Sequence, residues 1–177
     1  MAQTFRGAFE TEMKSCIHTL LLGFLLIASI GCRKSTQLSG NMAPTIKSGE
    51  RVTINYLAYS FGGPRRWDVV AMSGPTPLMP KNSVVLERII ALPGETLSLT
   101  STGIVVNGAV LRMPVALSNV VYCPPEQLPS ASLGISFPYT VPPNQYFVVG
   151  DNWANSLDSR FYGAVDVTNI LGKVKGK

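Results

Sequence analysis

Residues 83–95 read Ser-Val-Val-Leu-Glu-Arg-Ile-Ile-Ala-Leu-Pro-Gly-Glu, and this stretch decides the fold class. Its first eight residues are rich in β-branched and apolar side chains, which favours a strand over a helix. The Leu-Pro-Gly at 92–94 is a turn signal, because proline fixes one backbone angle and glycine accepts a left-handed one. A strand that runs into such a turn indicates sheet structure.

Further strand patterns lie on both sides of this stretch. They occupy residues 51–56, 68–72, 96–100, 103–107 and 146–149. The 177-residue chain also has 16 glycines and 13 prolines, and Asn107-Gly108 predicts a hairpin turn. We therefore expect an all-β domain over residues 33–177. Residues 113–143 are rich in proline and serine and too long for a plain loop, so we expect an excursion with its own ribbon or extended pieces.

Composition argues against several functions. The net charge is +5, but the positive residues are scattered without interleaved aromatics, so we expect no nucleic-acid partner. The only histidine, His18, lies in an apolar run, which leaves the folded domain without a histidine-dependent triad or a multi-histidine metal site. We accordingly expect no cofactor and no metal. With only Cys16, Cys32 and Cys123, a disulfide framework is excluded.

The apolar run near the N-terminus predicts membrane attachment. Its uninterrupted part, residues 20–30, is shorter than the about 20 residues of a typical span but suits the core of a signal peptide. The run ends in Ala-Ser-Ile-Gly before Cys32, which resembles a bacterial lipobox, where such a cysteine carries lipid. The alternative is an uncleaved anchor flanked by Arg33 and Lys34. We interpret residues 1–32 as a targeting or anchor segment.

Four short motifs follow one another along the chain. They are Ser-Gly-Asn-Met-Ala-Pro-Thr at 39–45, Arg-Trp-Asp-Val-Val at 66–70, Leu-Glu-Arg-Ile-Ile-Ala-Leu-Pro-Gly-Glu at 86–95, and Gly-Asp-Asn at 150–152 running into Ser-Leu-Asp-Ser-Arg at 156–160. In this order, over residues 38–172, the chain resembles the bacterial type I signal peptidases. The resemblance implies an antiparallel β catalytic core with an inserted β subdomain. It also implies a cytoplasmic-membrane protein whose bulk lies on the outer side.

The chain departs from the family at the two residues that carry the chemistry. A serine–lysine peptidase needs a hydroxyl nucleophile and a neutral amine beside it as general base, and burial keeps that amine neutral. The family's nucleophilic serine in Ser-x-Ser-Met-x-Pro-Thr corresponds to Asn41, and its lysine before Arg and Leu-Pro-Gly corresponds to Glu87. Loss of both predicts only residual catalysis at most.

Two interpretations of the Asn41 and Glu87 pair are open. In the first, a buried amide and a carboxylate hydrogen-bond each other, with Glu87 also close to Arg88, because a buried carboxylate needs partners. In the second, Glu87 activates a water molecule that Asn41 orients.

The resemblance also implies roles for the residues around Asn41. Ser39 matches a hydroxyl that helps to bind the oxyanion, and on an extended strand it would lie on the same face as Asn41, about 7 Å away. Met42, Ala43 and Pro44 match residues that flank the substrate groove.

The C-terminal motif matches scaffold residues of the family. Asp158 matches an acid that pairs with the arginine after the catalytic lysine, here Arg88. Ser156 matches a serine that hydrogen-bonds that lysine, so here it would satisfy Glu87. Arg160 matches a further charged scaffold residue, and Gly-Asp-Asn at 150–152 is interpreted as turn chemistry.

Three hypotheses for function result. The first is a catalytically inactive signal-peptidase-like protein that binds extended segments of exported or membrane-anchored polypeptides, because main-chain pairing needs no nucleophile. The second is an active signal peptidase I, a serine-type endopeptidase that uses another nucleophile such as Ser39, Ser156 or Ser159. The third is a purely structural lipoprotein. The paired loss at Asn41 and Glu87 favours the two non-catalytic hypotheses.

Overall fold

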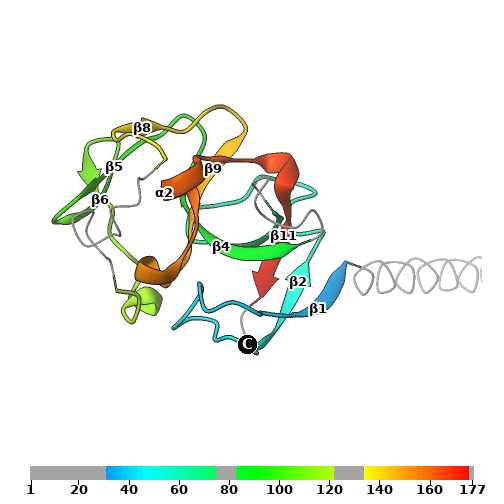
Figure 1. Cartoon of the computed structure of the whole chain (residues 1–177). Coiled ribbons are helices and arrows are strands. Elements are labelled where there is room, and N and C mark those ends of the chain that lie inside the picture. Colours follow the sequence, from blue (N-terminus) through cyan, green and yellow to red (C-terminus); the bar gives the residue numbers. More distant parts are fainter. Residues whose placement is uncertain (1–30, 75–82, 122–133, 176–177) are drawn as a thin grey trace, which may run out of the picture.

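The computed structural model describes residues 31–74, 83–121 and 134–175, which form strands and a few short helical turns (Figure 1). The strands are β1 (Cys32–Thr36), β2 (Arg51–Asn55), β3 (Val69–Ser73), β4 (Val84–Ala91), β5 (Thr96–Thr100), β6 (Gly103–Val106), β7 (Ala109–Val110), β8 (Tyr139–Thr140), β9 (Gln145–Val149), β10 (Val165–Asp166) and β11 (Ile170–Lys175). The helical pieces are η1 (Val115–Leu117), η3 (Trp153–Asn155), α2 (Ser159–Tyr162) and η4 (Val167–Asn169). The expected all-β class is confirmed. Within the described ranges, no helix is long and apolar enough to cross a bilayer.

The larger sheet is antiparallel and has the strand order β1-β2-β11-β3-β4-β9-β10. Strand β4 lies between β3 and β9, but the two neighbours cover different parts of it. Strand β3 pairs with residues 84–88 of β4, whereas β9 pairs only from Arg88 to Ala91. Among the described residues, no strand therefore pairs with residues 84–87 on the β9 side, and this stretch is called the free edge of β4.

The smaller sheet, of order β7-β6-β5-β8, is inserted between β4 and β9. The β6–β7 hairpin turns at Asn107 and Gly108, whose φ angles of 50° and 79° are the left-handed pair that the sequence predicted. Strand β8 pairs with β5 through Thr140 and Thr96. The insertion thus begins at β5, before the Pro-rich segment, and that segment returns to it as β8. Residues 122–133 of the segment, with Cys123, lie outside the described residues.

The strands that the sequence predicted are present within one or two residues of their expected limits. The strands that it did not predict are β1, β7, β8, β10 and β11. Their sequences explain the omission: β7, β8 and β10 have two residues each, β1 is Cys-Arg-Lys-Ser-Thr, and β11 is interrupted by Gly172 and two lysines. Such segments lack the apolar alternation that identifies a strand in sequence.

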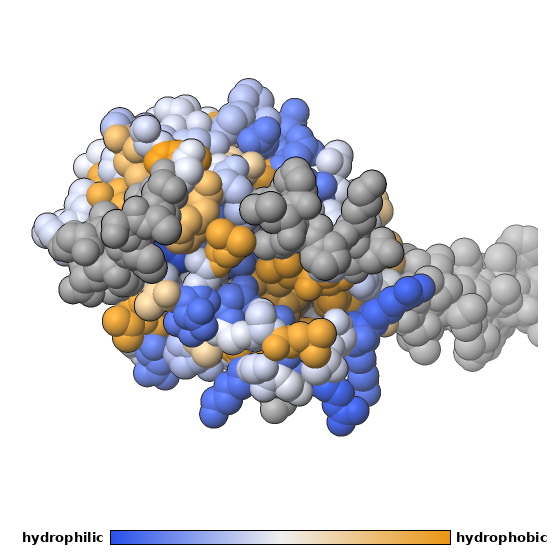
Figure 2. All heavy atoms as spheres, in the orientation of Figure 1, coloured by the Kyte–Doolittle hydropathy of each residue, from blue (hydrophilic) through white to orange (hydrophobic). Residues whose placement is uncertain are grey.

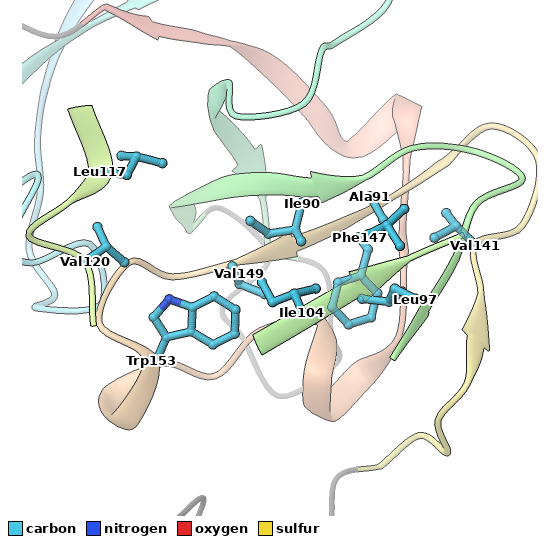
Figure 3. Close-up of a cluster of buried hydrophobic side chains, with 11 residues drawn as sticks. Ile90, Ala91, Leu97, Ile104, Leu117, Val120, Val141, Phe147, Val149 and Trp153 are labelled. Carbon is cyan, nitrogen blue, oxygen red and sulfur yellow. The ribbon is translucent and has the colours of Figure 1, made fainter. Parts of the chain in front are cut away.

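The two sheets share a hydrophobic core. Phe147 and Val149 of β9 pack with Leu97 of β5 and Ile104 of β6, with Trp153 at one end of the cluster (Figure 3). A second cluster, which includes Met42, Ile54 and Leu86, attaches the 38–45 segment to the larger sheet. These two clusters hold in place the elements that carry the site.

The N-terminal edge of the sheet includes residues that the sequence assigned to the targeting segment. Cys32 is the first residue of β1 and pairs with Asn55. Gly31 is buried against Leu57, and its carbonyl accepts a hydrogen bond of 2.7 Å from the Tyr56 amide. Hydrophilic side chains extend from this end of the molecule, whereas hydrophobic surface appears over the middle of the larger sheet (Figure 2).

Candidate functional site

Asn41 lies in a tight turn, so the extended geometry expected for residues 39–41 is wrong. The Ala43 amide donates to the Gly40 carbonyl at 3.1 Å within this turn. Asn152 fixes it from the other side, because its backbone amide donates to the Asn41 carbonyl at 2.8 Å and its side-chain amide to the Gly40 carbonyl at 3.1 Å. The Gly-Asp-Asn segment is therefore more than a turn, since it holds the backbone at Asn41.

Strand β4 brings Glu87 to the same point. The Asn41 Nδ2 donates to Glu87 Oε1 at 2.9 Å and to the Leu86 carbonyl at 2.8 Å. Glu87 is 0% exposed and Asn41 is 8% exposed. This is the amide–carboxyl hydrogen bond of the first interpretation. A primary amide has two N–H donors, and both are used here, which leaves Asn41 none to orient a water molecule.

Ser39 contacts Asn41, and its hydroxyl proton is used in a hydrogen bond to that residue. The Ser39 Oγ donates to Asn41 Oδ1 at 2.5 Å. Gln37, which is 4% exposed, donates from Nε2 to the same Oδ1 at 2.6 Å and to Ser39 Oγ at 3.0 Å. A hydroxyl has one hydrogen to donate, so Ser39 cannot serve an oxyanion without giving up Asn41. The role that the resemblance implied for Ser39 is thus opposed by the residue at the nucleophile position.

The environment of Glu87 favours its neutral form. Burial raises the pKa of the Glu87 carboxyl well above its usual value, and the negative charges of Asp158 and Asp151 raise it further. The hydrogen bond from Asn41 and the positive charge of Arg160 act in the opposite direction and do not outweigh these effects. The position that the resemblance matches to the family's lysine thus holds an acid whose pKa burial raises.

Arg88 pairs with Asp151, which corrects the pairing with Asp158 that the resemblance implied. The Arg88 Nε and Nη2 donate to the two carboxylate oxygens of Asp151 at 2.7 and 2.6 Å. Its Nη1 donates at 2.7 Å to the carbonyl of Trp67, a residue with a left-handed φ of 73° at the family's glycine position. Successive side chains of a strand point to opposite faces, so Arg88 is directed away from Glu87 and does not serve as its partner.

Asp158 pairs instead with Arg160, and both side chains are 0% exposed. The Arg160 Nε and Nη2 donate to the two oxygens of Asp158 at 2.8 and 2.7 Å, and Nη1 donates to the Trp153 carbonyl at 2.8 Å. Asp158 also caps α2 through the Arg160 amide and accepts from the Gly150 amide at 3.0 Å. The charged scaffold role implied for Arg160 is present, with a different acid from the one expected.

Ser156 does not satisfy Glu87, so that expectation is also wrong. Within the described part of the chain, Ser156 Oγ and Glu87 Oε2 are both buried without a hydrogen-bond partner. A methyl group at Gly150 would overlap with Ser156 Oγ and the Asn41 carbonyl, which explains why glycine precedes Asp151 in this motif.

A pocket of about 280 Å³ opens over this network. Its lining residues are Ser39, Gly40, Asn41, Val85, Glu87, Asn155 and Leu157. None of these seven described residues is basic. Of the residues predicted to flank a groove, Met42 is fully buried in the core, and neither Ala43 nor Pro44 lines the pocket. The described residues contain no group of three or more His, Cys, Asp or Glu side chains arranged to hold a metal ion.

Comparison with known proteins identifies the family. The family model described as signal peptidase, peptidase S26, matches residues 11–176. The chain belongs to the signal peptidase family. Its membership agrees with the order of the four motifs in the sequence.

Relatives within the signal peptidase family come from several bacteria. Signal peptidase I of Leptolyngbya laminosa is 33% identical over 76% of this chain and 63% of that protein. Signal peptidase IB of Staphylococcus aureus is 27% identical over 93% of this chain and 88% of that protein. A crystal structure of a signal peptidase I from Enterococcus faecalis is 30% identical, covers 63% of this chain and 97% of that chain, and has a TM-score of 0.47. The chain spans about three fifths of the length of the first two relatives it matches.

Sequence reasoning missed two residues of the site. Gln37 lies before the first motif, and nothing in its sequence context indicates that it binds Asn41. Asp151 was visible within Gly-Asp-Asn, but its partnership with Arg88 joins residues 63 positions apart. Only the packing of β4 beside β9 brings these two together.

Proposed function

We propose that this protein is a catalytically inactive member of the signal peptidase family that binds extended segments of exported or membrane-anchored polypeptides. The observation that carries the proposal is the hydrogen bond between Asn41 and Glu87 at the nucleophile and base positions. Peptide cleavage by a serine–lysine pair requires an alkoxide and an amine base. An amide group that is hydrogen-bonded to a carboxyl group supplies neither of them.

The other serines of the site do not replace the missing nucleophile. Ser39 donates to an amide oxygen, which is not a base. Ser159 is fully buried and its Oγ accepts from the Val148 amide at 3.0 Å. Ser156 Oγ is buried, and none of the described residues hydrogen-bonds it. A serine nucleophile needs a base within hydrogen-bond reach, so these contacts support the inactive role over an active peptidase with a different serine.

Binding of an extended chain is supported by the free edge of β4. Residues 84–87 lie beside the pocket, and Val85 and Glu87 contribute to both. Val84, at the start of this edge, is 44% exposed. A free strand edge offers main-chain donors and acceptors to an incoming strand, and adjacent pockets select side chains. The Leu86 carbonyl accepts from Asn41 Nδ2 at 2.8 Å, so an incoming strand would use the other main-chain groups of this edge. Peptide binding at this edge can therefore occur without catalysis, because main-chain pairing with β4 needs no nucleophile at position 41.

The test compares the full-length chain with an Asn41→Ser, Glu87→Lys double variant in detergent micelles. Each protein is incubated with a signal-peptide substrate, and cleavage is followed by mass spectrometry. We expect no cleavage by the unmodified chain, while it binds a non-cleavable substrate analogue in fluorescence anisotropy. Cleavage by the unmodified chain that Ser39→Ala abolishes would show an active peptidase. Absence of any peptide binding would refute the binding role.

We place the protein at the outer face of the cytoplasmic membrane, because the apolar residues 20–30 immediately precede the folded domain. Strand β1 begins at Cys32, and cleavage before Cys32 would remove the hydrogen bond between Gly31 and Tyr56. This contact favours an uncleaved anchor over a lipoprotein. Labelling of cells with radioactive palmitate tests it, since incorporation that depends on Cys32 would establish the lipoprotein instead.

A further inference from the structure

The site contains one carboxyl group more than it has cations to match. The Asp158–Arg160 and Asp151–Arg88 pairs are each closed by two hydrogen bonds. The remaining nitrogen of each guanidinium group donates to a backbone carbonyl. Glu87 is left with the Asn41 amide at Oε1, and no described residue bonds its Oε2. A buried acid with a free oxygen is suited to a partner that brings positive charge from outside.

The pocket has the form that such a partner needs. Val85 and Leu157 line it with apolar surface, and Glu87 is the only acidic residue among the described lining residues. Its volume of about 280 Å³ exceeds many times the share of a single water, roughly 30 Å³. The site therefore has room for a side chain that is apolar along its length and charged at its tip. Lysine combines these properties, because its four-carbon stem packs on apolar surface while the ammonium group is a compact donor.

We infer that this pocket binds the ammonium group of a lysine side chain carried by the polypeptide strand that pairs with the free edge of β4. The inference rests on the proposed peptide-binding function and specifies the sequence that it prefers. The bound lysine would donate to Glu87 Oε2, which is buried in the unbound chain, and the carboxyl proton of Glu87 would pass to solvent as the ammonium group enters. The ligand thus supplies from outside the amine that other members of the family hold at position 87.

Two further features support an ammonium group over other ligands. Ser156 Oγ and Tyr162 OH are buried hydroxyls that find no hydrogen-bond partner among the described residues. Burial is the largest influence that raises the pKa of Tyr162, and its electrostatic interaction with the nearby Glu87 is the next largest. Tyr162 OH is thus an additional acceptor near the Glu87 carboxyl group, and an ammonium group has three hydrogens to donate. An anionic ligand would bring no hydrogen to donate to these oxygens, and none of the described lining residues is basic.

The experiment measures binding of eight-residue peptides to the full-length chain in detergent micelles. The peptides contain alanine, valine and threonine, have blocked ends and a fluorescent label, and carry one variable residue at each of the four central positions in turn. That residue is lysine, norleucine, glutamine or Nε-acetyllysine. Norleucine keeps the apolar stem, whereas glutamine and acetyllysine keep an N–H donor without the charge.

We expect the lysine peptide to bind roughly tenfold or more tightly than the other three peptides in at least one position. The reason is that each of the other three side chains lacks the charge-assisted hydrogen bond of the ammonium group. Glu87→Gln should remove this preference. Asp166→Asn, which removes one acidic side chain at the end of β10 and not from the pocket lining, should keep it. Equal affinity for lysine and norleucine, or for lysine and glutamine, in every position would overturn the inference and leave peptide binding intact. If none of the peptides binds, both the inference and the proposed function fail.

Discussion

At the scale of single residues, the proposed inactivity depends on the hydrogen-bonded pair of Asn41 and Glu87. In a serine–lysine peptidase the hydroxyl and the amine must both remain free to transfer a proton. Here Asn41 uses both amide hydrogens and accepts two hydrogen bonds at Oδ1, from Gln37 and Ser39. Asn41 is therefore the centre of a closed hydrogen-bond network rather than a nucleophile. Glu87 is the exception within that network, because one of its oxygens is unpaired among the described residues.

The unpaired carboxyl predicts a pH-dependent stability. The folded pKa of Glu87 lies above the unfolded value near 4.5, so the folded state holds its proton over a range where the unfolded state releases it. Stability that comes from this proton is complete below about pH 4.5 and is lost as pH rises through the folded pKa. The Glu87→Gln variant has no carboxyl proton to lose. Its free energy of unfolding should therefore exceed that of the unmodified chain by an amount that grows with pH, to on the order of 1–3 kcal/mol.

Urea unfolding at several pH values between 4.5 and 8.5 measures this difference. Asp166→Asn is the matched control, because hydrogen bonds from Thr168 lower the pKa of the exposed Asp166. A group with a lowered pKa contributes stability above its unfolded pKa, so the control should gain nothing as pH rises. A pH-independent effect of Glu87→Gln would contradict the assignment of Glu87 as a buried, protonated acid.

At the scale of elements, the site depends on how β4 is paired. Because the pairing of β9 with β4 stops at Arg88, the Gly-Asp-Asn segment can turn across and hold the 38–45 turn. Residues 84–87 then have no strand partner on this side among the described residues. The far side of β4 is covered by β3, which in turn pairs with β11. Strand β11 has a register shift between Ile170 and Gly172, where the chain passes close to the end of β2.

This close approach predicts that Gly172→Ala is destabilising. A methyl group at position 172 would lie 2.5 Å from the Asn55 carbonyl oxygen and 3.0 Å from the Tyr56 Cα. Both are backbone atoms, so the strands must shift, at a cost of roughly 1–3 kcal/mol. Gly40→Ala is the control, because a methyl group there meets nothing within 4 Å, and its effect should stay within about 0.5 kcal/mol. Thermal unfolding followed by circular dichroism compares them, and equal melting temperatures would show that the sheet absorbs the methyl group.

At the scale of the whole molecule, the two sheets behave as one folded body because they share side chains. Phe147 comes from the larger sheet, and its ring centre lies 5.5 Å from that of Tyr139 and 6.3 Å from that of Phe137, both in the chain that returns to the smaller sheet. Burial of such aromatic contacts between the sheets couples their stabilities.

Phe147→Ala should therefore lower the free energy of unfolding by about 3–5 kcal/mol, the usual cost of removing a buried aromatic ring. We expect one cooperative transition, with the same midpoint by tryptophan fluorescence and far-ultraviolet circular dichroism. Trp67 and Trp153 both contact the shared core, so fluorescence reports on it directly. Two separated transitions in the unmodified protein would show that the sheets unfold independently.

The sequence by itself determined the all-β class, the central strands, the hairpin at Asn107-Gly108, the family, and the positions of Asn41 and Glu87. These are local or motif-level properties, because strand alternation, turn chemistry and residue identity are carried by neighbouring residues. The tertiary structure decided which residues meet. It paired Arg88 with Asp151 rather than Asp158, placed Gln37 against Asn41, turned residues 38–45 away from a strand, and left Glu87 with a free oxygen. Each of these depends on side-chain directions set by strand register across long sequence separations, which no local pattern records.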